Sequence, residues 1–279
     1  ELLNKVLAKT HQKGALNTIL LQYNPGNDLI GSTKPYVEYQ RVLTDIIKKE
    51  LEILRKHLVT SDLPAIIKGV SLMEYYNDEC RAFNDIDLLC SDRSKLNKLC
   101  NALLRMGYIC GDPDYKLDFE SNSNYSIPIF YRELVITSNS EFAESLNYLI
   151  SNKHSNSLWK EPNGEFIQRL EIDIHKSMFI LDDWTFPIMT DEHFVDSRSV
   201  VGYKVLGRAA LLPYISSKFY NDIHFIKKGD LDYARCVKLM GDFIRVVENC
   251  THNDLLEAFE IAEHWNSQSN LLSMFNYVT

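Results

Sequence analysis

Apolar residues recur every three or four positions over residues 36–58, and this spacing is typical of an amphipathic helix. The apolar positions are Val42, Ile46, Ile47, Leu51, Leu54 and Leu58. The opposite face is strongly charged, as expected for a helix at the protein surface. The pattern therefore predicts a long helix with one face packed against a core.

Two short apolar runs after this helix have the length of buried strands. The first, residues 65–67, ends at Lys68 and Gly69. A glycine at the end of a strand favours a tight turn, and we expect this turn to lead into a helix over residues 72–76. The second run covers residues 85–90 and predicts another strand.

A second amphipathic helix should follow, capped by Asp92 or Ser94 and ended by Gly107. Its predicted inner face consists of Leu96, Leu99, Leu103 and Leu104. Beyond it lie short segments rich in aromatic and β-branched residues, separated by turn signals. We expect these segments to extend the sheet with antiparallel strands over residues 108–110, 115–119, 125–131 and 134–137.

Residues 166–175 alternate more regularly than any other part of the chain. Successive side chains of a strand point to opposite faces, so this strand has an apolar face and a polar face. The apolar face carries Leu170, Ile172 and Ile174. The polar face carries Glu171, Asp173 and His175.

The C-terminal part, from about residue 208, has an almost wholly helical pattern, with Asp230 and Asn253 near predicted helix starts. We find neither an internal repeat nor a low-complexity linker. The predicted organisation is α+β: a sheet-containing domain with N-terminal helices over residues 1–206, and a helical domain over residues 207–279.

Composition and charge narrow the class of protein. The chain has 279 residues, of which 45% are hydrophobic, so a folded core is expected. The formal net charge of −8 disfavours non-specific binding to nucleic acid. No apolar stretch is long enough to cross a membrane, and the first residues lack the layout of a signal peptide. The six cysteines lack zinc-ligand spacing, which predicts reduced thiols and a cytoplasmic protein.

Two aspartates interrupt the apolar strand over residues 85–90. Strand geometry places Asp85 and Asp87 on the same face, where their negative charges repel each other. A divalent cation would relieve this repulsion, and oxygen ligands suit Mg²⁺. Asp173 or Glu171, on a neighbouring strand, would complete a site able to hold two ions.

The turn at Gly69 fits the same chemistry. Backbone N–H groups at the start of a helix bind phosphate oxygens, and Lys68 and the Ser71 hydroxyl can add contacts. Metal-bound carboxylates beside a phosphate-binding turn support nucleotidyl transfer. An Asp-x-Asp or a Lys-Gly alone is more often structural, so the prediction rests on the ordered set of motifs.

This set resembles the motifs of the nucleotidyltransferase superfamily that has the DNA polymerase β fold. Residues 68–72 read Lys-Gly-Val-Ser-Leu, Arg81 follows, and residues 85–89 read Asp-Ile-Asp-Leu-Leu. A bacterial nucleotidyltransferase family carries these motifs and a later Asp/Glu-apolar-His, which residues 173–175 match. The likeness covers most of residues 64–247, and it implies a mixed sheet with flanking helices followed by a helical region.

The resemblance also implies roles for individual residues. It makes Asp85, Asp87 and Asp173 the metal-binding and catalytic carboxylates. It assigns Lys68, Gly69, Ser71 and Arg81 to the nucleotide. Many relatives have the serine directly after glycine, whereas Val70 intervenes here, and Glu171 competes with Asp173 for the third position. His175 could orient the acceptor, act as a base, or simply pack.

We therefore expect a Mg²⁺-dependent enzyme that transfers a nucleoside monophosphate from an NTP, with ATP as the expected substrate, and releases pyrophosphate. A small molecule or peptide is the expected acceptor, given the acidic chain. An alternative is a toxin-like nucleotidyltransferase that modifies tRNA, which the same motifs also resemble. A second alternative is a non-catalytic nucleotide-binding regulator.

Overall fold

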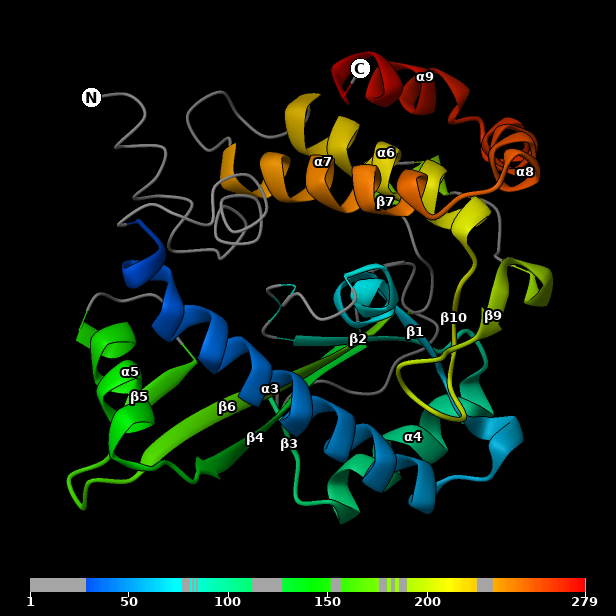
Figure 1. Ribbon diagram of the computed structural model, residues 1–279. Helices are drawn as coiled ribbons and strands as arrows, with labels where there is room; N and C mark the ends of the chain where they lie inside the picture. Colours follow the sequence, from blue (N-terminus) through cyan, green and yellow to red (C-terminus); the bar gives the residue numbers. More distant parts are fainter. Residues whose placement is uncertain are drawn as a thin grey trace.

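The computed structural model describes residues 29–76, 81, 83, 85–111, 127–151, 157–175, 180–181, 184–185, 190–224 and 233–278. Its centre is an eight-stranded sheet in the order β3-β4-β6-β2-β1-β10-β9, with β5 also paired to β6 (Figure 1). The strands of this sheet are β1 (Ala65–Ile67), β2 (Asp85–Leu89), β3 (Ile109–Cys110), β4 (Ile127–Ile136), β5 (Leu158–Lys160), β6 (Phe166–His175), β9 (Phe194–Asp196) and β10 (Lys204–Leu206). Strands β7 (Ile180–Leu181) and β8 (Trp184–Thr185) form a separate pair.

The described helices flank this sheet and fill the C-terminal part. The α-helices are α3 (Leu29–His57), α4 (Arg93–Arg105), α5 (Ser140–Ser151), α6 (Arg208–His224), α7 (Tyr233–Glu248), α8 (His252–His264) and α9 (Gln268–Val278). Three 3₁₀ helices complete the set: η1 (Thr60–Asp62), η2 (Lys68–Tyr75) and η3 (Asp191–His193). Within the described residues, none of the helices combines the length and apolar character needed to cross a bilayer.

The sheet is mixed. Strands β2 and β6 are parallel, as are β1 and β10, whereas the other pairs are antiparallel. Together with the helical C-terminal region, this arrangement confirms the predicted α+β class and is consistent with the polymerase β-like fold.

A first apolar core lies on one face of the sheet, beneath α3, which crosses the strands in Figure 1. Leu170, Ile172 and Ile174 of β6 are buried in this core, as predicted from their alternation. Helix α3 contributes Leu43, Ile47, Leu51 and Leu54 from the other side of this core. Polar contacts also cross this layer; for example, the buried Tyr39 hydroxyl donates to Gln168 Oε1 at 2.6 Å.

A second apolar core joins α6, α7, α8 and α9. It also takes in Leu72, Tyr75 and Tyr76, which belong to η2 and its C-terminal end. The segment after β1 is therefore shared between the sheet and the C-terminal helices. The division of the chain at residues 206 and 207 stays a prediction.

Two expected boundaries and one expected core residue differ in the structure. The helix after β1 is of the 3₁₀ type and starts at Lys68, not at residue 72. The expected strands 125–131 and 134–137 form one strand, β4, because Arg132 and Glu133 continue its pairing with β6. Leu104 is 52% exposed, since it lies about 100° around the helix from the buried Leu103. The expected strand 115–119 and helix-start residue Asp230 lie outside the described residues.

Candidate active site

Strands β2 and β6 bring the predicted carboxylates together. They are parallel neighbours in which Asp85 lies beside Glu171 and Asp87 beside Asp173. These side chains share the sheet face opposite the first core, because Ile86 is buried in that core. Residues separated by 86 positions along the chain thus meet on adjacent strands.

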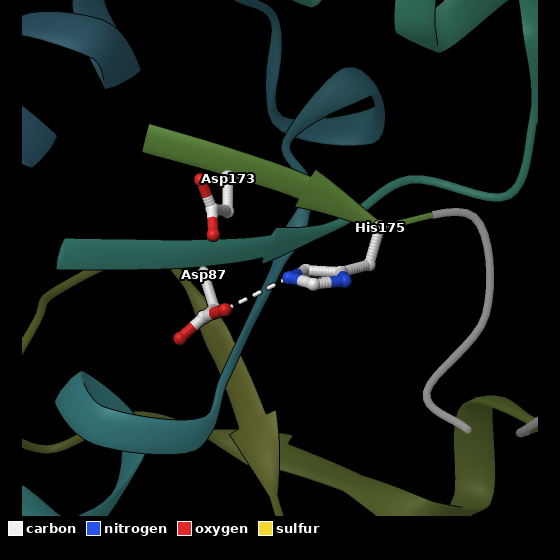
Figure 2. A group of neighbouring side chains, drawn as sticks. All are labelled: Asp87, Asp173 and His175. Carbon is white, nitrogen blue, oxygen red and sulfur yellow. Dashed lines mark hydrogen bonds and ion pairs between the residues drawn. The ribbon is translucent and has the colours of Figure 1, made fainter. Parts of the chain in front are cut away.

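Three side chains on this face form a group that could hold a metal ion: Asp87, Asp173 and His175 (Figure 2). One ligand atom from each lies within 4.8 Å of the others. Asp85 lies on the same face, two positions before Asp87, but is not part of this group. Glu171 is not part of it either; its carboxylate lies 3.8 Å from Arg169 Nε.

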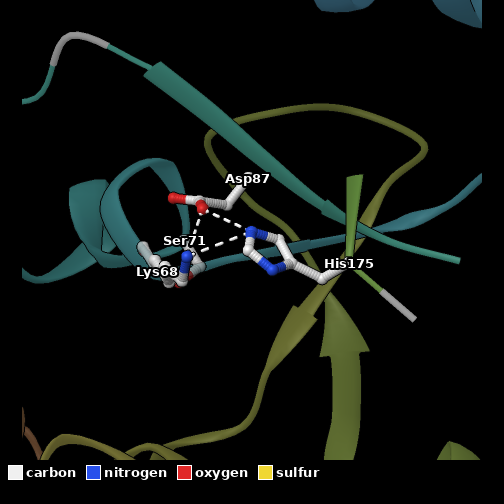
Figure 3. Close-up of polar contacts among 4 residues, drawn as sticks. All are labelled: Lys68, Ser71, Asp87 and His175. Atoms are coloured by element: carbon white, nitrogen blue, oxygen red, sulfur yellow. Dashed lines mark hydrogen bonds and ion pairs between the residues drawn. The ribbon is translucent and has the colours of Figure 1, made fainter. Parts of the chain in front are cut away.

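Asp87 is the most enclosed of these carboxylates, with only 3% of its surface exposed. Its Oδ1 atom lies 2.5 Å from Lys68 Nζ and 2.8 Å from His175 Nε2 (Figure 3). The two nitrogens are themselves 3.0 Å apart. Burial alone would raise the pKa of Asp87, but the hydrogen bond from His175 and the attraction of Lys68 lower it below its usual value. Asp87 is therefore ionised at neutral pH.

Asp173 has the opposite electrostatic environment. Burial, reinforced by repulsion from Asp87 and Asp85, raises its pKa to about 6. A divalent cation would relieve this repulsion directly. The donor set of two carboxylates and one imidazole fits such an ion, since carboxylates suit Mg²⁺ and Mn²⁺ and imidazole is a common metal ligand.

The Lys68 backbone is strained. Its φ of 58° lies in the left-handed region, which non-glycine residues seldom adopt and which often marks functional sites. The Ser71 hydroxyl donates to the Lys68 carbonyl at 2.5 Å and holds this turn. Because Ser71 is fully buried, its observed contact is with the turn itself, and the expected phosphate contact stays a prediction.

Gly69 is needed for close packing and not for a left-handed φ. A Cβ atom at this position would lie 3.0 Å from Arg81 Nη1 and 3.1 Å from Phe83 Cβ. The backbone of the turn therefore lies directly against these two residues. This explains the glycine physically, while its assignment to the nucleotide stays a prediction.

Arg81 is buried and paired with Asp242 of α7. Its Nε and Nη2 atoms donate to the two carboxylate oxygens at 2.8 and 2.6 Å. Its assignment to the nucleotide stays a prediction, since in the structure its contact is with a carboxylate of the C-terminal helices. This pairing could not be predicted from the sequence, because the two residues are 161 positions apart.

His175 is the residue whose metal-binding capacity the sequence analysis missed. Its position on the polar face of β6 was predicted, but its reach to Asp87 depends on the pairing of β6 with β2. The Asp/Glu-apolar-His pattern was the signal that could have suggested it as a ligand.

A family model described as uncharacterised nucleotidyltransferase matches residues 26–278. No curated protein and no solved structure matches the chain. The family match contains the Lys68 turn, both strands of the metal-ligand group and the C-terminal helices. The chain therefore belongs to this nucleotidyltransferase family.

Proposed function

We propose that this protein is a Mg²⁺-dependent nucleotidyltransferase that uses an NTP, with ATP as the expected substrate, and releases pyrophosphate. The observation that carries the proposal is the meeting of Asp87, Asp173 and His175 on two adjacent strands, beside a lysine in a strained turn. Such a group offers a divalent cation its ligands and offers a triphosphate a positive charge at the same place.

In this proposal Asp87 and Asp173 hold the cation, with Asp85 and His175 as further ligands for one or two ions. When bound, the cation would supply Lewis-acid activation and neutralise charge on the phosphate oxygens. The Lys68 ammonium, now on Asp87, would contact the triphosphate, and the N–H groups of the turn would add hydrogen bonds. An acceptor heteroatom would bond to the α-phosphorus as the bond to pyrophosphate breaks.

A partly exposed row of residues beside the carboxylates supports a small-molecule or peptide acceptor. A row of neighbouring residues crosses the strands from Ile109 through Tyr131 and Glu171 to Asp85. Ile109 is exposed, and Arg169 stacks over the Tyr131 ring with its Cζ atom 3.9 Å from the ring centroid. Because this surface has one arginine beside two acidic residues, and the whole chain has a net charge of −8, it suits a small acceptor better than a phosphate backbone.

Calorimetric titration with ATP, GTP, CTP and UTP in the presence of Mg²⁺ tests the nucleotide half of the proposal. We expect one nucleotide to bind the wild type and to bind the Asp85→Asn/Asp87→Asn variant much more weakly. Glu171→Gln is the matched control, since it removes a carboxylate from the same face outside the metal-ligand group. Equal binding by the wild type and the double variant would refute the assignment of the site.

Transfer from α-labelled NTP then separates the acceptor classes. Label in amino acids or peptides would support the proposed acceptor, whereas label in tRNA would favour the toxin-like alternative. Nucleotide binding that is never followed by transfer or pyrophosphate release would favour the regulator.

A further inference from the structure

A fully buried carboxylate of the C-terminal helices lies behind the Lys68 turn. Asp242 of α7 has no exposed surface. Its Oδ1 atom accepts from the Tyr76 hydroxyl at 2.5 Å and from Arg81 Nε at 2.8 Å. Its Oδ2 atom accepts from Arg81 Nη2 at 2.6 Å. Asp242 thus accepts three hydrogen bonds from two residues, one directly after η2 and one before β2.

Arg81 links this carboxylate to the site. Two of its nitrogens donate to Asp242, while the third, Nη1, is buried and has no hydrogen-bond partner among the residues that the structure describes. Nη1 is directed at Gly69, where a Cβ atom would be only 3.0 Å away. Burial alone would lower the pKa of Arg81, but attraction from Asp242, with smaller contributions from Tyr76 and Asp85, raises it above its usual value. The guanidinium is therefore a fixed positive charge between α7, the turn and Asp85.

We propose that Asp242 is a positioning residue for the nucleotide site. It orients Arg81, and Arg81 in turn supports the backbone of Gly69 and keeps Lys68 in the left-handed conformation that directs its ammonium group to Asp87. Helix α7 thereby becomes part of the site without contacting the substrate. This inference rests on the proposed nucleotide binding.

A purely structural role is the alternative, since a buried ion pair need have no function beyond packing. The protein contains a similar network elsewhere that serves for comparison. Glu50 of α3 is buried and accepts from the Tyr108 hydroxyl at 3.0 Å and from Arg132 Nη1 at 3.3 Å. Both networks join a buried carboxylate to a tyrosine and an arginine, but the Glu50 network has no contact with Gly69.

The test compares Asp242→Asn with Glu50→Gln in two binding measurements on the full chain, at a temperature where each variant is folded. Calorimetry with Mn²⁺ alone reports the group formed by Asp87, Asp173 and His175. Calorimetry with MgATP, or with the NTP that the wild type prefers, reports the turn. For Asp242→Asn we expect NTP affinity to fall by about tenfold, which corresponds to about 1.4 kcal/mol. We expect Mn²⁺ affinity to equal that of the wild type or exceed it up to several-fold, because a displaced Lys68 ammonium group would compete less with the cation for Asp87. Glu50→Gln should leave both affinities unchanged.

A double variant separates positioning from stability. Replacing a buried ion pair by apolar residues often preserves stability, so Arg81→Met/Asp242→Leu should regain much of the thermal stability lost in Asp242→Asn. If Asp242 positions the turn, the double variant stays defective in NTP binding. Tyr76→Phe removes one hydrogen-bond donor to Asp242 and keeps the ion pair with Arg81, so it should lower NTP affinity by a smaller factor. This variant replaces Asp242→Asn in the test if Asp242→Asn does not fold.

Three results would overturn the inference. The first is an NTP affinity of Asp242→Asn equal to that of the wild type. The second is a loss of NTP affinity in Glu50→Gln as large as that in Asp242→Asn. The third is a double variant that recovers NTP affinity together with thermal stability. Each would leave the proposed function standing, because the wild type would still bind nucleotide. A wild type that binds Mn²⁺ but no NTP would instead refute the proposed function, and the inference with it.

Discussion

Replacing Asp173 with Asn should stabilise the metal-free protein above pH 6 while it weakens metal binding. The native carboxyl group has a pKa of about 6, compared with 3.8 for an unperturbed aspartate, because of burial and repulsion by Asp87 and Asp85. Keeping this carboxylate ionised therefore costs the folded state free energy. An asparagine has the same shape and avoids that cost.

The magnitude follows from the two pKa values. A difference of about two units corresponds to about 3 kcal/mol. Because the Asp173 side chain is only partly buried, solvent screening reduces the expected gain to about 1–1.5 kcal/mol. The native group binds its proton more tightly than the unfolded one, so the wild type loses this stability as pH rises from about 4 to about 6. The gain from the substitution should thus be near zero at pH 4 and complete at pH 8.

Denaturant unfolding with EDTA, followed by tryptophan fluorescence at several pH values from 4 to 8, measures this difference. Glu171→Gln is the control, since Glu171 is more exposed and lies near Arg169; its stability should stay within about 0.5 kcal/mol of the wild type. Added Mg²⁺ should stabilise the wild type by mass action and Asp173→Asn much less. A variant that is less stable than the wild type at pH 8, or a gain that does not change with pH, would refute the reasoning.

Two further substitutions test the Lys68 turn. Gly69→Ala would place a methyl group 3.0 Å from Arg81 Nη1 and 3.1 Å from Phe83 Cβ, so it should lower the free energy of unfolding by about 1–3 kcal/mol. Thermal denaturation measures this loss, and an unchanged midpoint would contradict the observed packing. Lys68→Met removes the ammonium group 2.5 Å from Asp87 Oδ1, which would compete with a cation for that oxygen. Calorimetry should show Mn²⁺ binding strengthened several-fold and NTP binding weakened by about tenfold; weaker Mn²⁺ binding would argue against the competition.

The sequence predicted the local elements of the site well because strand geometry fixes which side chains share a face. Alternation placed Asp85 with Asp87, and Asp173 with His175, before any pairing was known. The choice between Glu171 and Asp173 remained open in the sequence, since both lie on the same face of β6. The β2–β6 register places Asp173 beside Asp87 and Glu171 beside Asp85. Asp173 is favoured because its ligand atom lies close to those of Asp87 and His175, and this proximity depends on contacts between segments far apart in the chain.

The backbone of the turn was less predictable for a different reason. A Lys-Gly pair normally assigns the unusual conformation to the glycine, yet here Lys68 has the positive φ. The neighbours decide this: Gly69 packs against Arg81 and Phe83, and the Lys68 ammonium is held by Asp87. Strain of this kind is a property of the assembled site and leaves no mark in local propensity.

The position of η2 links the C-terminal helices to the proposed site, although these helices supply none of the metal-ligand group. Leu72, Tyr75 and Tyr76 are buried in the C-terminal core, whereas Lys68, at the start of the same 3₁₀ helix, reaches Asp87 on the sheet. The short helix therefore spans both cores, and a shift of the C-terminal helices relative to the sheet would move Lys68 relative to the carboxylates. The Asp242–Arg81 ion pair opposes such a shift at the point where the two cores meet. Because a rigid support is what holds a charged group within ångströms of its working position, the C-terminal helices are expected to affect nucleotide binding more strongly than metal binding.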